Sequence, residues 1–247
     1  VCVSSQSSSP VADVASFFRT FYAPNNAALV VVGDFDRTQT LAWIRKYFES
    51  IPAVPQPQPV DLTEPRQTAE KRTGRVDSLA SRPALGIAYH VPARNTPEWY
   101  AMGLLDQILG QGNDSWLYDE LVRKKGLTGE VSSGINWGLG NMFDYNGPML
   151  WMLSVYHDRD VPADSIVAGV DRVIQRITSQ PVDKATLDRA MTKMRSSLYD
   201  AVEMFNGFGR ANLLASFALF DDDPARTNRL EAPAGGDAGG EAGQVLD

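Results

Sequence analysis

The sequence predicts an α+β protein, because stretches with the two-residue period of a strand occur beside stretches with the period of a helix. Residues 85–91 alternate between apolar positions and small or polar ones, as in a half-buried strand. The segments 131–137 and 148–156 are also strand-like, and the glycine-rich stretch between them is typical of an antiparallel connection. A weaker, polar strand is expected near 68–76.

Amphipathic helices account for most of the remaining chain. The stretch 97–109 has a Thr-Pro start signal and ends before Gly110. The stretch 115–125 has its acids early and its bases late, an order that the helix dipole favours. A last helix is expected to begin at Asp223. The other segments with apolar residues at helical spacing are 11–22, 37–48, 166–177, 187–205 and 208–220.

The stretch "NNAALVVVGDFDRTQTLAWIRKYF", residues 25–48, predicts a strand, a tight turn and a helix. Residues 27–32 are uniformly apolar, as expected of a strand that is covered on both faces. The turn at Gly33 does not fit a dinucleotide-binding loop, because Phe35 and Arg37 stand where further glycines are required. It is therefore interpreted as a structural connection.

Composition argues against several functional classes. The formal charge is -7, whereas nucleic-acid-binding proteins usually carry a basic face. No apolar run approaches the roughly 20 residues that span a bilayer. Cys2 is the only cysteine, so the chain has no internal disulfide. We therefore expect neither a nucleic-acid partner nor a membrane span.

A proline-rich stretch divides the chain. Prolines at 52, 55, 57, 59 and 65 predict an extended linker over 52–66, which separates residues 1–51 from a larger piece at 67–231. The Ala/Gly-rich residues 232–247 cannot bury enough apolar surface to become ordered, so they are expected to form a disordered tail.

Two segments carry a family resemblance. "FFRTFYAPNNAALVVVGDFD" and "LGQGNDSWLYDELVRKKGL" resemble the zinc peptidases of the insulinase/pitrilysin family, the inverzincins, over about residues 11 to 230. The resemblance implies two homologous domains, each a mostly antiparallel sheet backed by helices, that face each other as halves of a clamshell. Residues 1–51 would be the end of the first, catalytic-type domain. Residues 67–231 would be the second, non-zinc domain, and an incomplete one, since the family has a further helix and closing strand.

The resemblance also implies where the chemistry lies. In the family an H-x-x-E-H helix of the first domain supplies two histidine ligands and the glutamate base, and a further glutamate completes the zinc site. The two histidines of this chain, His90 and His157, do not begin that motif, so it would lie before Val1. We expect no catalytic residue, no metal ligand and no cofactor on this chain, whose partner would bear the zinc.

In active relatives the second domain contacts the peptide and the tetrahedral intermediate, commonly through an arginine and a tyrosine seven residues apart. Val122 and Gly129 occupy these two positions, so both polar groups are absent. The candidate substrate contacts that remain are Arg123, Lys124, Ser115 and Tyr118, with Lys125 beside them. The bases have an alternative role at the carbonyl end of their own helix. Backbone groups of the strand edge after Gly129 are another candidate contact.

The resemblance thus predicts the non-catalytic C-terminal portion of a zinc metallopeptidase, which encloses and contacts peptide substrate for a zinc-bearing domain or subunit. One alternative is a structural or partner subunit of the same family. Another is an unrelated α+β binding module. The family relationship favours a periplasmic or other extracytoplasmic location, since many bacterial members are exported, whereas the residues themselves indicate no compartment.

Overall fold

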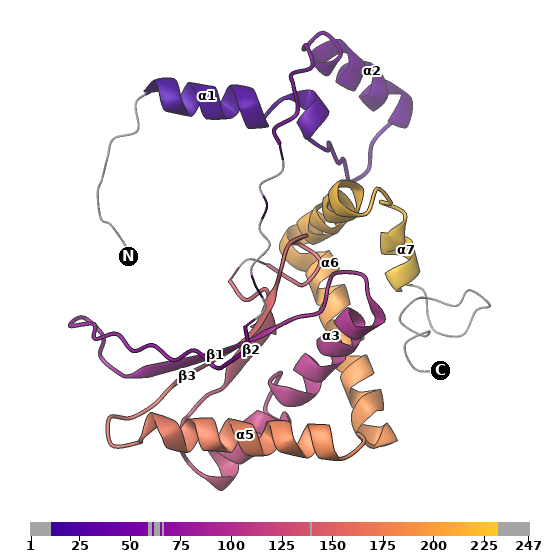
Figure 1. Ribbon diagram of the computed structural model, residues 1–247. Helices are drawn as coiled ribbons and strands as arrows, with labels where there is room; N and C mark the ends of the chain where they lie inside the picture. The colour runs from indigo at the N-terminus through magenta and orange to yellow at the C-terminus, as the bar shows by residue number, and fades with distance from the viewer. Residues whose placement is uncertain (1–10, 59–60, 62–64, 66, 139, 232–247) are drawn as a thin grey trace.

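The computed structural model describes residues 11–58, 61, 65, 67–138 and 140–231 (Figure 1). The predicted tail at 232–247, Cys2 and part of the linker lie outside these residues. The elements in chain order are α1 (Val11–Phe21), the 3₁₀ turn η1 (Pro24–Asn26), α2 (Arg37–Phe48), β1 (Ala84–His90), α3 (Pro97–Leu109), α4 (Trp116–Tyr118), the π-helix η2 (Asp119–Lys124), β2 (Ser132–Ile135), β3 (Leu150–Tyr156), α5 (Ala163–Ser179), α6 (Lys184–Phe220) and α7 (Arg226–Glu231).

A three-stranded antiparallel sheet in the order β1-β3-β2 forms the centre of the protein. Leu153 of the middle strand lies opposite Ile87 on one side and Ser133 on the other. Because side chains alternate along a strand, Trp151, Leu153 and Val155 share one face, and all three are buried. The strands predicted at 85–91, 131–137 and 148–156 are confirmed, and so is the α+β fold.

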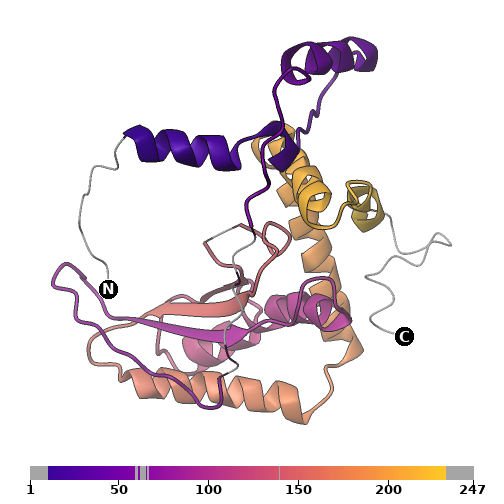
Figure 2. The same cartoon turned by 45° about the horizontal axis from the view of Figure 1, so that its top comes forward.

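Helices cover this buried face (Figures 1 and 2). Ile166 and Val170 of α5 belong to the same core cluster as the strand residues, and so does Phe217 of α6. Trp99 of α3 meets Phe143 edge to face with 5.4 Å between ring centroids, and Phe143 meets Phe217 in the same way at 5.5 Å. Such aromatic pairs each add about 0.5 to 1.5 kcal/mol beyond the area they bury.

Helix α6 is one continuous element, although the sequence predicts two helices at 187–205 and 208–220. It begins at Asp183, whose carboxylate accepts a hydrogen bond from Thr186 N at 2.9 Å. A glycine inside a helix lowers the stability of the helix by about 1 kcal/mol, but the helix continues through it where packing compensates for that lost stability. The buried Leu213 and Phe217 supply that packing. Among the helices of the described ranges, none is long and apolar enough to cross a membrane.

The N-terminal piece does not form the strand predicted at 27–32 (Figure 1). These residues are extended, but none of the three strands of the sheet pairs with them, although β1 and β2 are edge strands. The described residues near 68–76 do not form the polar strand predicted there either. Among the described residues before 59, only Ala23 is buried, and α1 and α2 lie away from the sheet.

Asn25 fastens the linker to this N-terminal piece. Its Nδ2 donates to Val54 O at 2.8 Å, and its Oδ1 accepts from Val54 N at 3.2 Å. Gln56 also donates a side-chain hydrogen bond to Asn25 O. The first residues of the linker are therefore hydrogen-bonded to the N-terminal piece.

Candidate functional site

The segment with the candidate substrate contacts winds in two different helical forms. In α4, the Ser115 hydroxyl caps the first turn by accepting from Tyr118 N at 3.4 Å. From Asp119 to Lys124 the chain is a π-helix, where the sequence pattern predicts an α-helix. Gly126, with φ 60°, ends the turn. A π-helix relates residues five apart instead of four, and such turns are frequent at functional sites.

The π-helix decides which side chains meet. The Arg123 guanidinium lies over the ring of Tyr118, 5.5 Å from its centroid. Lys124 Nζ lies 2.7 Å from Asp119 Oδ2. Both contacts join residues five apart. The charge of Lys124 is therefore compensated within the helix, whereas Arg123 contacts an aromatic ring.

Helix α5 holds this turn in place. Arg172 Nε donates to Glu120 Oε1 at 2.9 Å, and the Glu120 side chain is only 15% exposed. Leu121 is fully buried, and a Cβ added at Gly169 would come within 2.5 Å of Leu121 Cδ2. Glycine at 169 is thus what allows α5 to approach the π-helix so closely.

The structure separates the four candidate contacts. Tyr118 and Arg123 lie together, and Arg123 and Lys124 are exposed at the surface. Ser115 is 1% exposed, and its hydroxyl accepts the hydrogen bond that caps the helix. In this structure the Ser115 hydroxyl is buried and caps the helix, so its contact with substrate stays a prediction.

Val122 and Gly129, which stand at the positions of the family's polar pair, bring no polar side chain to the surface. Val122 is half-buried. Gly129 is exposed, and a Cβ added there would meet no atom within 4 Å. The space for a larger side chain at 129 is therefore present and open.

The histidines lie at opposite ends of the sheet. His90 pairs with Leu150 at the start of β3, whereas His157 follows the end of β3 and donates its backbone N–H to Pro83 O at 3.1 Å. Seven residues of strand separate the two levels, which corresponds to roughly 23 Å. The described part of the chain holds no cluster of three His, Cys, Asp or Glu side chains suited to a metal ion. The residues present do not fit the family's zinc.

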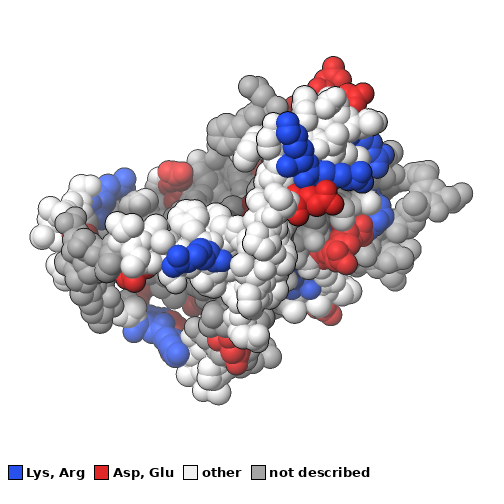
Figure 3. Space-filling model, turned by 90° about the horizontal axis from the view of Figure 1, so that it is seen from above, with Lys and Arg blue, Asp and Glu red and all other residues white. Residues whose placement is uncertain are grey.

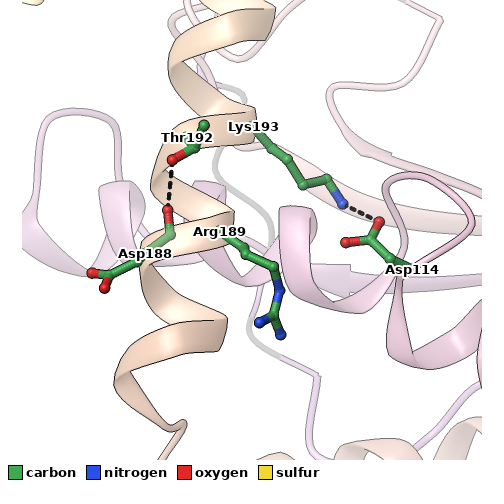
Figure 4. A pocket seen from close by; sticks show the side chains of 5 residues that line it. All are labelled: Asp114, Asp188, Arg189, Thr192 and Lys193. Atoms are coloured by element: carbon green, nitrogen blue, oxygen red, sulfur yellow. Dashed lines mark hydrogen bonds and ion pairs between the residues drawn. The ribbon is translucent and has the colours of Figure 1, made fainter.

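A surface hollow of about 320 Å³ lies between α6 and the loop after α3 (Figure 4). Lys193 points across it, donating to Asp114 Oδ1 at 2.8 Å and to Gln107 O at 3.2 Å. The hydrogen bond from Lys193 holds the pKa of Asp114 below its ordinary value. On the α6 side, Asp188 accepts from Lys184 Nζ at 2.8 Å. The bonds from Lys193 join α6 to the end of α3 and give the hollow a structural role.

A buried carboxylate that sequence reasoning missed joins α3 to the sheet. Asp106 accepts hydrogen bonds from Trp151 Nε1 at 2.6 Å, Ser133 Oγ at 2.8 Å and Gln111 Nε2 at 3.0 Å. Burial raises the pKa of Asp106, and the three donors oppose that rise only in part. The one sequence signal is an acid in the middle of a mostly apolar helix.

A second buried network joins the start of α3 to the end of α6. Arg94 donates to both carboxylate oxygens of Asp221, at 2.9 and 3.3 Å, and both side chains are 5% exposed. Asn95 and Arg226 contact the same carboxylate. Burial alone would raise the pKa of Asp221, but the hydrogen bonds from Arg94 and Asn95 and the two guanidinium charges hold it below its ordinary value.

Comparison with known proteins decides the family. A family model described as "Peptidase M16 inactive domain" matches residues 10–194, most of the chain. The chain belongs to the peptidase M16 family. The expected C-terminal, non-zinc portion of an insulinase-like peptidase is thereby confirmed, as an M16 inactive domain.

Curated relatives of this M16 domain are zinc proteases. It is 23% identical over 215 residues to "Zinc protease PqqE" of Helicobacter pylori, an alignment that covers 85% of this chain and 46% of that protein. It is 29% identical over 125 residues to an uncharacterized zinc protease of Streptomyces coelicolor, covering 49% of this chain and 27% of the relative. The chain thus spans half or less of the length of these relatives.

Solved structures show the same fold. A protease from H. pylori superposes with a TM-score of 0.73 at 20% identity, over 95% of this chain and 55% of that one. A peptidase M16 inactive domain from Pseudomonas fluorescens superposes with a TM-score of 0.68 at 20% identity, over 96% of this chain and 53% of that one. At this level of identity the likeness concerns the fold alone.

Proposed function

We propose that this M16 inactive domain encloses and contacts a peptide substrate for a zinc-bearing half that carries H-x-x-E-H. The observation that carries the proposal is the uncovered apolar surface of the N-terminal piece. Phe17, Phe18 and Trp43 are 51%, 52% and 53% exposed, and Leu29 is 58% exposed. Soluble proteins rarely leave such a set of large apolar side chains uncovered unless another surface packs on it.

The form of this surface indicates what covers it. Residues 27–32 are extended and apolar, and their backbone groups have no strand beside them within the described residues. An unpaired extended segment is completed most simply by the edge of another sheet. Helix α1 carries only two charged residues, Asp13 and Arg19, and the face of the molecule seen from above shows mostly uncharged side chains at that end (Figure 3). The occupant we propose is therefore the sheet of the zinc-bearing half, and relatives that are twice as long support this choice.

Within the assembled protein, Arg123, Lys124 and Tyr118 are the proposed peptide contacts. Arg123 and Lys124 are exposed and belong to a helical turn that α5 holds rigidly. A structural subunit without substrate contact is the second candidate, and the lack of polar groups at Val122 and Gly129 favours it. If the assembled protein cleaves peptide equally well after Tyr118→Leu and Arg123→Gln, the structural role is the better description.

The test starts with the chain alone and then adds its partner. Alone, the purified chain should neither bind stoichiometric zinc nor cleave an unstructured peptide. Mixed with the H-x-x-E-H polypeptide of the same organism, it should form a stoichiometric complex by light scattering, and cleavage should appear. Stoichiometric zinc together with chelator-sensitive proteolysis by the chain alone would overturn the proposal.

A pair of matched variants tests the proposed contact surface. Val31→Asp places a charge in the extended segment, where the side chain is 41% exposed, and should abolish the complex. Val76→Asp makes the same change at a side chain that is 97% exposed in the loop before β1, and should leave the complex intact. Equal assembly of the two variants would rule out the segment at 27–32 as the contact.

A further inference from the structure

The acids of the π-helix are both engaged. Asp119 is paired with Lys124, and Glu120 is paired with Arg172 of α5. Arg123 is exposed, and across the described ranges it takes part in no ion pair; its partner is the ring of Tyr118. The turn therefore leaves one guanidinium at the surface with its charge uncompensated.

An ordinary α-helix would pair these side chains differently. Residues four apart would then meet, so that Asp119 would face Arg123 and Glu120 would face Lys124. Both pairs have the acid on the N-terminal side, which is the favourable order, and both bases would be neutralised. In the π-helix Asp119 pairs with Lys124 instead, and Glu120 pairs with Arg172 of α5, so neither acid pairs with Arg123.

The released guanidinium is arranged to accept a planar anion. A guanidinium carries five N–H donors in a rigid fork that matches a carboxylate, and stacking on an aromatic ring occupies its face but not its edge. The ring of Tyr118 limits the freedom of Arg123, so less entropy is lost on binding. The chain as a whole has a formal charge of -7, so an acidic ligand would be attracted here by local contacts and not by the net charge.

We propose that the π-helix presents Arg123, held against Tyr118, as a receptor for a peptide carboxylate, and thereby gives this surface a preference for acidic peptides. The inference deepens the proposed substrate contact and rests on it, since peptide is the ligand. The carboxylate belongs either to an Asp or Glu side chain or to a free C-terminus.

The experiment measures binding of three fluorescent peptides to the intact chain by anisotropy. One amidated Gly/Ser peptide contains a central Asp-Asp pair, the second has Asn-Asn instead, and the third is the Asn-Asn peptide with a free C-terminal carboxylate. At least one carboxylate peptide should bind about tenfold or more tightly than the amidated Asn-Asn peptide, the effect of one charge-assisted hydrogen-bonded pair. Comparison of the first and third peptides shows whether Arg123 binds a side-chain carboxylate or a C-terminal one.

Four variants distinguish recognition by Arg123 from general electrostatic attraction. Arg123→Gln should abolish the preference, and Arg123→Lys should retain only part of it, because lysine keeps the charge but loses the fork. Arg159→Gln removes the same charge from an exposed turn after β3 and should have no effect. The double variant Lys184→Gln with Asp188→Asn removes an internally neutral, exposed pair on α6 and should also preserve the preference.

Equal binding of all three peptides would overturn the inference. So would a loss of the preference for carboxylate peptides that is equally large in Arg123→Gln and Arg159→Gln. Because Arg123 is exposed, its variants should fold, which the urea midpoint verifies. Assembly with the zinc-bearing half is scored separately. A complex that cleaves peptide without acidic preference would refute the inference and leave the proposed function standing, whereas failure to assemble would refute the proposed function itself.

Discussion

Replacing Asp221 with alanine tests the buried ion pair that joins the start of α3 to the end of α6. Arg94 and Asp221 are each 5% exposed, and Arg226 is 8% exposed beside them. Removal of one partner leaves buried cationic charge without compensation, which costs about 3 to 5 kcal/mol. Arg94 keeps its bond to Phe143 O at 2.8 Å, but a neutral carbonyl cannot replace the lost charge.

The same loss can be expressed as a melting temperature. With about 2.1 cal/mol/K of unfolding entropy per residue over about 150 residues, 3 to 5 kcal/mol corresponds to a fall of about 10 to 16 °C. Urea unfolding followed by tryptophan fluorescence measures the free energy directly, because Trp99 lies in this part of the core. Asp222→Asn, at the exposed neighbouring residue, is the matched control and should change the stability by less than about 0.5 kcal/mol. A loss below about 1 kcal/mol for Asp221→Ala would show that the pair is solvated.

Three further changes have defined outcomes. Burial raises the pKa of Asp106 above its value in the unfolded chain, about 4. The stability that Asp106 contributes is therefore full below about pH 4 and is lost as the pH rises through the folded pKa. In urea titrations, the difference in free energy of unfolding between wild type and Asp106→Asn should shrink with rising pH. Gly169→Val should cost about 1 to 3 kcal/mol in the same assay, because its side chain would displace the buried Leu121; an unchanged midpoint would contradict the close approach of α5. Lys193→Met should raise the pKa of Asp114 in an NMR titration and cost about 1 kcal/mol, and an unmoved pKa would exclude the pairing.

Elements that depend on local period could be predicted from the sequence. The three strands and α3 were expected, and the Thr96 cap, whose hydroxyl accepts from Trp99 N at 3.2 Å, agrees with the Thr-Pro signal. The segment 27–32 shows the limit of the method. Its composition favours a strand, but a strand also needs a neighbour to take its backbone hydrogen bonds, and pattern alone cannot show whether that neighbour is present.

The site depends on relationships that no short window of sequence contains. The positions 119–124 have the same apolar spacing whether the turn is α or π, and the choice is made by packing against Gly169 and Arg172 of α5. Arg94 and Asp221 are 127 residues apart in the chain. Ser115 was a candidate substrate contact, whereas a serine at that position serves equally as a helix cap, and the sequence alone does not show that its side chain is buried.

The distribution of charge separates a scaffold from a contact surface in this domain. Lys193, Arg94 and Arg172 each compensate a carboxylate that lies on another element, and so join helices. Arg123 has no such partner in the described part of the chain, although two acids lie three and four positions before it. The pairing four residues apart that an α-helix provides contributes only about 0.2 to 0.5 kcal/mol, so the packing of the fully buried Leu121 against α5 outweighs it. The π geometry that this packing selects gives up that pairing and leaves Arg123 at the surface, where it is available to a ligand.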